Sequence, residues 1–221
     1  MRIDAETLRE MGAILAAEDR DEMAIPSFLH KNPALRWMAW RRVEVVARML
    51  ERVCPQGGTV LDYGCGTGVL FEAALTKAGA VVGVDLVLGA AKLWKSRRNL
   101  QAVTLLTPPE VDATVADASV DVVVAAEVLE HIDEPAPTLA MFRRVLKPGG
   151  SLLVSLPTEN RAYKFGRRMA GFDGHFHVHN ASNLHTVLLG SGFDVAERSW
   201  IPLPGPLAIY MVARYTRTGG K

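Results

Sequence analysis

Residues 60–68 read V-L-D-Y-G-C-G-T-G and place three glycines at alternate positions directly after an apolar run. Glycine loses more conformational freedom on folding than any other residue, so a cluster of glycines is costly unless the backbone needs it. Gly64, Gly66 and Gly68 therefore predict either a tight turn or a place where a ligand comes close to the main chain. We favour the ligand-binding loop, because two carboxylates accompany the glycines.

Asp62 lies two residues before the first glycine, and Asp85 ends the next apolar run, seventeen residues beyond Gly68. A carboxylate at the second place can accept hydrogen bonds from the hydroxyls of a ribose, or it can cap a helix. The glycines are one residue short of the G-x-G-x-x-G spacing of dinucleotide-binding loops, and the Gly-Lys-Ser/Thr of a phosphate loop is absent. A carboxylate at position 62 suits an ammonium or sulfonium group better than a pyrophosphate.

A third group of candidates lies in the segment E-V-L-E-H, which contains Glu127, Glu130 and His131. The unperturbed pKa of histidine lies near neutrality, so His131 is a candidate general base. The three side chains are also of types that bind metal ions. A packed, hydrogen-bonded histidine is the commoner outcome, and we predict no metal site here.

The later part of the chain holds further groups that could contact an acceptor. His175, His177 and His179 would share one face of an extended segment, where they could bind zinc or line a pocket. We favour the pocket, which makes His177 a second candidate base. Arg161–Arg168 is rich in bases and aromatic residues, and Ile201–Leu207 is an apolar, proline-rich loop. Each could touch an anionic or apolar acceptor, or could be an ordinary surface segment.

The elements that must position these residues alternate along the chain. Apolar periodicity and capping signals predict helices over residues 4–17 and 33–52, and from residue 59 onward strands alternate with helices. The predicted strands are 59–63, 80–85, 102–106, 120–126, 151–156, 195–200 and 207–215. The predicted helices between them are 69–78, 88–98, 136–146 and 183–189. This alternation is typical of a parallel, doubly wound α/β sheet, which binds ligands at the carboxyl ends of its strands.

The overall composition narrows the class of protein. The chain has 221 residues, of which 49% are hydrophobic, and this suits one α/β domain with a small appendage. A formal net charge of +1 argues against nucleic acid as a partner. No segment has the apolar length of a signal peptide or a membrane-spanning helix, and two cysteines make no disulfide framework. These features predict a cytoplasmic protein.

Four segments, in order, resemble the motifs of the class I S-adenosylmethionine-dependent methyltransferases. They are V-L-D-Y-G-C-G-T-G, V-V-G-V-D, A-S-V-D-V-V-V-A-A-E-V-L-E-H-I and R-R-V-L-K-P-G-G-S-L-L-V-S-L-P. The chain looks most similar to the small-molecule enzymes that include the ubiquinone and menaquinone methyltransferases. The resemblance spans Thr59 to Tyr215 and implies a Rossmann-like, seven-stranded, mostly parallel sheet whose last strand is antiparallel. It also implies S-adenosylmethionine as the cofactor.

The resemblance further implies which residues contact that cofactor. They are Asp62, Gly64, Cys65, Gly66, Gly68, Asp85, Leu86, Pro109 and Glu127. The glycines would let the backbone approach the methionine and ribose portions, Asp85 would bind the ribose, and Glu127 would lie beside the methionine portion. The acidic-alanine pair that meets the adenine in this family is absent here. Its register points to Pro109 within Thr107–Glu110.

We expect residues 1–58 to form a helical cap over the cofactor and residues 59–221 to form the methyltransferase domain. The expected reaction is methyl transfer to an oxygen, nitrogen or carbon atom of a small, apolar or amphipathic acceptor, such as a lipid or a quinone precursor. The protein would align the reactants and remove one proton, with His131 or His177 as the base. A methyltransferase acting on RNA or protein, and a non-catalytic cofactor-binding module, are the alternatives.

Three features predict contact with an amphipathic acceptor or the periphery of a membrane. Two are the basic stretch Arg161–Arg168 and the apolar loop Ile201–Leu207. The third is the cap helix, for which we expect a group of arginines beside tryptophans on the active-site side. This group consists of Trp37, Trp40, Arg41 and Arg42. Arginines beside apolar side chains suit a ligand with an anionic head and an apolar body.

Overall fold

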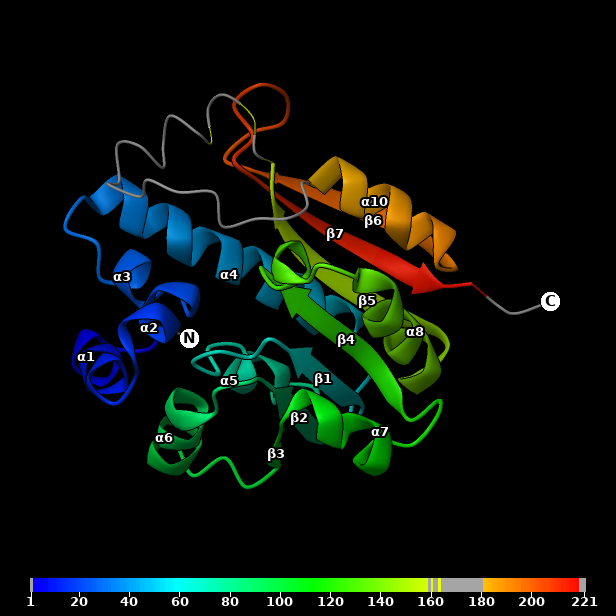
Figure 1. Ribbon diagram of the computed structural model, residues 1–221, viewed down its shortest axis with the longest axis horizontal. Coiled ribbons are helices and arrows are strands. Elements are labelled where there is room, and N and C mark those ends of the chain that lie inside the picture. Colours follow the sequence, from blue (N-terminus) through cyan, green and yellow to red (C-terminus); the bar gives the residue numbers. More distant parts are fainter. Residues whose placement is uncertain (1, 159, 161–162, 164–180, 219–221) are drawn as a thin grey trace.

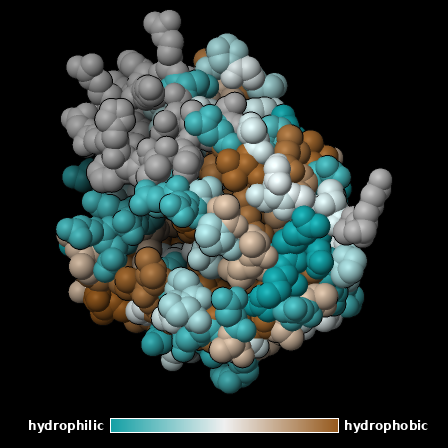
Figure 2. Space-filling model, turned by 45° about the vertical axis from the view of Figure 1, so that its right-hand side comes forward, coloured by the Kyte–Doolittle hydropathy of each residue, from teal (hydrophilic) through white to brown (hydrophobic). Residues whose placement is uncertain are grey.

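The structure is a computed structural model, and it describes residues 2–158, 160, 163 and 181–218 (Figure 1). Within these residues, none of the helices combines the length and the apolar character needed to cross a bilayer. On the face drawn in Figure 2, hydrophobic residues form separate patches among hydrophilic ones.

The described strands form a single seven-stranded sheet in the order β3-β2-β1-β4-β5-β7-β6. Their bounds are β1 Thr59–Tyr63, β2 Ala80–Val84, β3 Val103–Leu106, β4 Val120–Ala126, β5 Leu146–Pro157, β6 Phe193–Ile201 and β7 Tyr210–Arg217. β7 pairs antiparallel with both β5 and β6, while the pairs among β1 to β5 are parallel. The order reverses between β1 and β4, where doubly wound sheets bind ligands. The predicted fold and its antiparallel last strand are confirmed.

Helices cover both faces of this sheet (Figure 1). One face carries α4 Pro33–Val53, α5 Phe71–Ala74 and α6 Gly89–Arg97, and the other carries α7 Val111–Thr114, α8 Pro135–Val145 and α10 Ala181–Gly190. Each face buries its own apolar cluster. β4 is buried on both sides, because its alternate residues Val122 and Val123 belong to opposite clusters. This explains why the strand reads as a continuous apolar run.

The first helices lie beside α6 and α4, at one end of the molecule (Figure 1). α1 spans Ala5–Ala13, α2 spans Ala17–Glu22 and α3 spans Ile25–Phe28. Asp4 caps α1 as its sequence suggests, because its carboxylate accepts hydrogen bonds from the amide of Thr7 at 2.9 Å and its hydroxyl at 2.7 Å. The single helix predicted over residues 4–17 is wrong, since α1 ends at Ala13 and the chain turns before α2.

α4 begins where predicted, with Asn32 as its cap and Pro33 at its first position. The helix contacts β4, β5, β6 and β7, so it forms one layer of the sheet rather than packing only on the other N-terminal helices. The division of the chain at residue 58 stays a prediction.

Three other predicted boundaries differ from the structure. The helix expected over residues 69–78 is reduced to α5, because the glycine loop extends to a turn at Gly68 whose carbonyl accepts from Phe71. β5 begins at Leu146 rather than Ser151, since Leu146 already pairs with Val120. β7 begins at Tyr210 rather than Leu207, because Leu207 lies in a turn in which the amide of Ala208 donates to the carbonyl of Gly205 at 3.0 Å.

Candidate cofactor and active site

A pocket of about 440 Å³ opens at the carboxyl ends of β1, β2 and β4. Its walls come from the glycine loop after β1, from the segments after β2 and β4, and from α2, α3 and α4. The pocket therefore lies beside the point where the strand order reverses, as expected for a ligand site in a doubly wound sheet.

The glycine loop adopts a conformation that only glycine takes readily. Gly64, Gly66 and Gly68 have φ angles of +75°, +51° and +74°. A Cβ atom at Gly64 would come within 2.7 Å of Val128, and one at Gly68 within 2.4 Å of the Phe71 ring. Gly64 and Gly66 line the pocket. Gly68 is not among the lining residues, and its small size allows close packing on Phe71, so its contact with a ligand stays a prediction.

Asp85 lines the pocket directly after β2. Its Oδ2 accepts a hydrogen bond from the amide of Gly66 at 2.7 Å, and its Oδ1 accepts one from the amide of Val87 at 3.1 Å. The carboxylate is thus fixed to the glycine loop and to its own loop. Each oxygen keeps lone-pair capacity for a further donor, such as a ribose hydroxyl.

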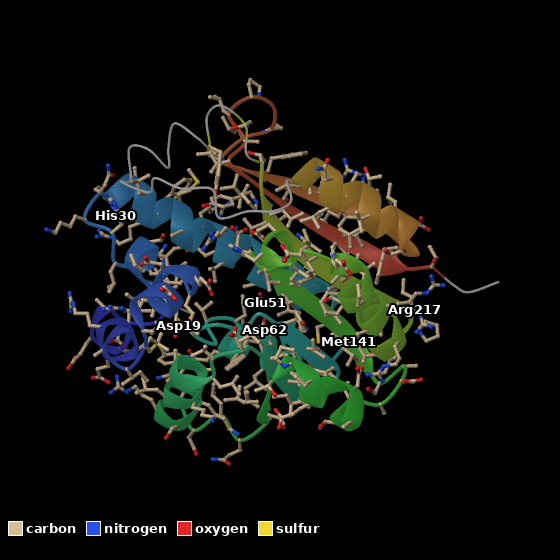
Figure 3. All side chains as sticks on the ribbon, in the orientation of Figure 1. Asp19, His30, Glu51, Asp62, Met141 and Arg217 are labelled. Atoms are coloured by element: carbon tan, nitrogen blue, oxygen red, sulfur yellow. The ribbon has the colours of Figure 1, made fainter. Side chains whose placement is uncertain are left out.

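Asp62, near the middle of the molecule, and Asp19 of α2 both line the pocket (Figure 3). The Asp62 side chain is only 4% exposed, and its carboxyl has no hydrogen-bond partner among the described residues. Burial, together with the nearby charge of Asp85, raises the pKa of Asp62 to about 7. A nearby cation would favour the ionised form of a buried carboxyl of this kind.

Cys65 also lines the pocket, between the first two glycines of the loop. Burial raises the pKa of its thiol well above the usual value, and Asp62 and Asp85 add to the effect. The thiol is therefore neutral near pH 7. A neutral, buried thiol contributes a small apolar surface and is a poor nucleophile.

Arg42 of α4 lines the pocket, although the sequence analysis placed it only near an acceptor and not among the cofactor-binding residues. Its Nη1 donates to Glu127 Oε2 at 2.9 Å, and Glu127 Oε1 accepts from the hydroxyl of Ser155 at 2.6 Å. The side chains of Arg42 and Glu127 are 13% and 19% exposed. Among the described residues that line the pocket, Arg42 is the sole lysine or arginine. The missed signal is its helical register, because it lies between Met38 and Val46 on the apolar stripe.

The arginines and tryptophans of α4 that we predicted on the active-site side lie in different environments. Trp40 is buried against Phe28, with ring centroids 4.5 Å apart, and Arg42 points into the pocket. Trp37 remains 47% exposed. Residues that are close in sequence point in different directions around a helix, so these side chains of α4 lie in separate environments.

Comparison with known proteins identifies the family. A methyltransferase domain family matches residues 34–198, well over half of the chain. The chain belongs to this family. A ubiquinone biosynthesis O-methyltransferase of Azoarcus sp. is 38% identical over 113 residues, which cover 49% of this chain and 48% of that protein. A probable S-adenosylmethionine-dependent methyltransferase of Mycolicibacterium smegmatis is 34% identical over 177 residues, or 80% of this chain and 65% of that one.

The chain spans about half the length of the first of these relatives. Solved methyltransferases share the fold over more of the chain. The N-methyltransferase NodS of Bradyrhizobium japonicum, solved with S-adenosyl-l-homocysteine, has a TM-score of 0.68 at 19% identity and covers 96% of this chain and 99% of its own. A SAM-dependent methyltransferase of Aquifex aeolicus has a TM-score of 0.66 at 18% identity, covering 98% and 100%. At these identities the likeness concerns the fold.

The pocket's donors and acceptors fit S-adenosylmethionine, the cofactor of this family of methyltransferases. That molecule carries a positive ammonium and sulfonium, a carboxylate, a ribose diol and an adenine ring. The pocket offers the buried carboxyl of Asp62, the cation of Arg42 and the oriented carboxylate of Asp85. Leu86 lines the same pocket with an apolar side chain that is 79% exposed, a surface that a flat ring would cover.

In the segment that we expect to meet the adenine, the residue that lines the pocket is one position earlier than predicted. Pro108, rather than Pro109, lines the pocket, at the first position of the short helix η1, Pro108–Glu110. Glu110 turns back instead, and its Oε2 accepts from the amide and the hydroxyl of Thr107, both at 2.7 Å. This reciprocal cap holds Glu110 away from a ligand.

The structure describes one of the two candidate bases, His131, and does not describe the other, His177. His131 lines the pocket at the end of the short helix η2, Leu129–His131. His177 lies outside the described residues, together with His175, His179 and most of Arg161–Arg168. Glu130 is fully buried behind the pocket wall. Within the described part of the chain, no three histidine, cysteine, aspartate or glutamate side chains are grouped as a metal site.

Proposed function

We propose that this protein transfers the methyl group of S-adenosylmethionine to a small, apolar or amphipathic acceptor. One observation carries the proposal. A single pocket at the strand switch point combines a buried carboxyl, an oriented carboxylate and a cation, on Asp62, Asp85 and Arg42. These are the charges that complement the amino, ribose and carboxylate groups of the cofactor.

Each of these residues would bind a different part of the cofactor. Asp85 would accept hydrogen bonds from the ribose hydroxyls, since two amides already fix its orientation. Asp62 would face the ammonium group, and its burial makes a cationic partner favourable. Arg42 would bind the carboxylate with guanidinium donors that Glu127 does not use. Leu86 and Pro108 would hold the adenine between apolar surfaces.

S-adenosylmethionine supplies an electrophilic methyl group on a sulfonium, which is already a good leaving group. The protein therefore needs chiefly to hold the two reactants in line and to exclude water. One proton must leave an oxygen or nitrogen nucleophile during or after the transfer. His131 lies in the pocket wall, and we assign it the role of general base.

The acceptor class rests on the apolar part of the pocket. The walls away from Asp85 include Phe28, Val43, Val46, Ala126 and Val128, so an acceptor entering there meets mostly hydrocarbon. Several relatives are named ubiquinone biosynthesis O-methyltransferases, which supports an apolar acceptor with a hydroxyl group. We further propose that the protein touches a membrane surface peripherally when it collects such an acceptor.

The decisive experiment combines cell extract, purified protein and cofactor with an isotopically labelled methyl group. Mass spectrometry should find the label in a small, apolar molecule, and the matched variant Asp85→Asn should reduce the labelling strongly. Label in RNA or in a polypeptide would instead support the alternative acceptor classes. Normal cofactor binding without any labelled product would support a non-catalytic module.

A further inference from the structure

The guanidinium of Arg42 is held from two directions by elements far apart in sequence. Glu127, just after β4, accepts a hydrogen bond from Nη1 at 2.9 Å. On another side, the guanidinium carbon lies 5.2 Å from the centre of the Tyr210 ring, at the start of β7. A cation at this distance from an aromatic ring is attracted by the negative face of the ring.

The two contacts do different work. A single hydrogen bond fixes one end of a long arginine side chain, which has several rotatable bonds, but leaves the plane of its guanidinium free to turn. An aromatic ring beside the cation restricts that plane. Arg42 must present its remaining donors to a ligand carboxylate in one direction, so the ring bears directly on how well it binds.

Tyr210 is itself firmly placed. Its backbone pairs with Pro157 of β5 and with Ile201 of β6, so it belongs to the sheet on both sides. Its ring meets the ring of the buried Tyr163 edge-on, with centroids 6.0 Å apart. Burial raises the pKa of the Tyr210 hydroxyl, although its hydrogen bond with Arg42 acts in the opposite direction, so the side chain stays neutral over the physiological range. Tyr210 thus places an uncharged aromatic ring, fixed by the sheet, beside the guanidinium of Arg42.

We propose that Tyr210 is a positioning residue for cofactor binding and acts through Arg42. The proposal rests on the proposed function, because it takes the cofactor's carboxylate as the partner of Arg42. Tyr210 is not among the residues that line the pocket, and it lies outside every motif by which the sequence resembles the family. It connects the antiparallel end of the sheet to the cofactor site.

The test compares two ligands that differ only in the part that Arg42 would hold. S-adenosylhomocysteine has the amino-acid portion, whereas 5′-methylthioadenosine has the same nucleoside thioether without it. In calorimetric titrations, Tyr210→Leu should weaken S-adenosylhomocysteine binding about 2- to 30-fold, the range of one cation–aromatic contact. The affinity for 5′-methylthioadenosine should stay within about twofold of the wild-type value. Tyr210→Phe keeps the ring, so its affinity for S-adenosylhomocysteine should be much closer to the wild-type value than that of Tyr210→Leu.

A double-mutant cycle then asks whether Tyr210 acts through Arg42. In an Arg42→Gln background, Tyr210→Leu should cause little further loss of S-adenosylhomocysteine affinity. An equal loss in both backgrounds, or an equal loss for both ligands, would overturn the proposal and indicate a general disturbance of the fold. A loss for Tyr210→Phe as large as for Tyr210→Leu would overturn the role of the ring and assign the positioning of Arg42 to the Tyr210 hydroxyl. If the wild-type protein bound neither ligand, the proposed function itself would fail, which is a different result from normal binding that ignores Tyr210.

Discussion

At the scale of single residues, several side chains of the pocket are in environments or conformations that lower the stability of the ligand-free protein. Asp62 is buried without a hydrogen-bond partner among the described residues, and Leu86 exposes an apolar side chain. Glu127 has a φ angle of +57°, a conformation that non-glycine residues seldom adopt, and its contacts with Arg42 and Ser155 hold it there. Such departures from local preference concentrate at functional sites.

Asp62→Asn should stabilise the cofactor-free protein while weakening cofactor binding. The folded pKa of about 7 lies above the unfolded value, so the native state binds more protons, and stability falls as the pH rises from about 4 through 7. The cost of ionising this buried group is then roughly 4 kcal/mol above pH 7, and asparagine avoids it. Urea unfolding at pH 5 and pH 8, with calorimetric cofactor titrations, measures both effects.

The matched control for this prediction is Asp21→Asn, which changes an exposed aspartate on α2. It should leave the pH dependence of stability unchanged. Equal stability of the wild-type protein and Asp62→Asn at pH 8 would show that the buried carboxyl carries no ionisation cost.

At the scale of elements, hydrogen bonds between polar side chains and the backbone connect neighbouring strands at motif positions that lie away from the pocket. Asp121, at the start of β4, accepts from the amide of Thr59 in β1 at 2.8 Å and from Lys147 Nζ at 2.8 Å. This cluster lies at the end of the sheet away from the pocket. Asp121 and Lys147, which belong to the motifs that resemble the family, therefore connect strands and do not contact the pocket.

Asp121→Ala should destabilise the fold by about 1–3 kcal/mol, because the amide of Thr59 loses its side-chain acceptor. Lys147→Ala is the matched control. It removes only the ammonium of a half-exposed pair and should cost about 0–1 kcal/mol. Denaturant unfolding separates the two, and similar losses in both variants would assign the effect to the ion pair instead.

A second fastening joins α10 to the last two strands and depends on pH. Arg198 donates to His185 Nε2 at 2.5 Å, so this nitrogen must accept, and Nδ1 then carries the hydrogen that faces Tyr215 Oη at 2.8 Å. Protonation would place a hydrogen on Nε2 against the guanidinium. Burial, together with the charge of Arg198, lowers the pKa of His185.

Stability should therefore fall on acidification below about pH 6.5, where the unfolded chain takes up a proton that the folded His185 resists. The loss continues until the pH has passed below the lowered folded pKa. Thermal unfolding between pH 5 and pH 8 should show this slope in the wild-type protein. His185→Gln should have a flatter profile over the same range, and an unchanged profile would remove His185 as its source.

At the scale of the whole molecule, the antiparallel end of the sheet carries a rigid apolar loop. Thr158 and Asn160 donate to the carbonyl of Ala208 and hold this loop against the chain that follows β5. The loop presents Leu203 and Leu207, which are 59% and 58% exposed. Its place between β6 and β7 supports our proposal that it touches an apolar acceptor or a membrane surface.

Leu203→Asp together with Leu207→Asp should reduce recovery of the protein on anionic vesicles in a flotation assay at least tenfold, because two apolar anchors are replaced by charges that anionic lipid repels. Leu189→Asp, which alters an exposed leucine on α10, is the matched control and should leave recovery unchanged. Wild-type protein that ignores vesicles would contradict the membrane contact and leave the methyl-transfer proposal standing.

The sequence by itself determined the layered architecture and much of the cofactor pocket. Local rules suffice for these features. The apolar run of β4 requires burial on both faces, and the glycines of residues 64–68 require φ angles and contacts that side chains forbid. Asp85 follows because it ends the strand that parallel pairing places beside the loop.

The tertiary structure alone decided which distant groups share the pocket. Arg42 lies in a helix whose rotation about its axis depends on packing against the sheet, so the sequence did not separate it from Arg41 or assign it to the cofactor. The path of the chain around Phe71 and η1 likewise leaves Gly68 and Pro109 outside the lining of the pocket. Tyr210 reaches Arg42 only because β7 inserts between β5 and β6, and no local pattern encodes a pairing over that separation.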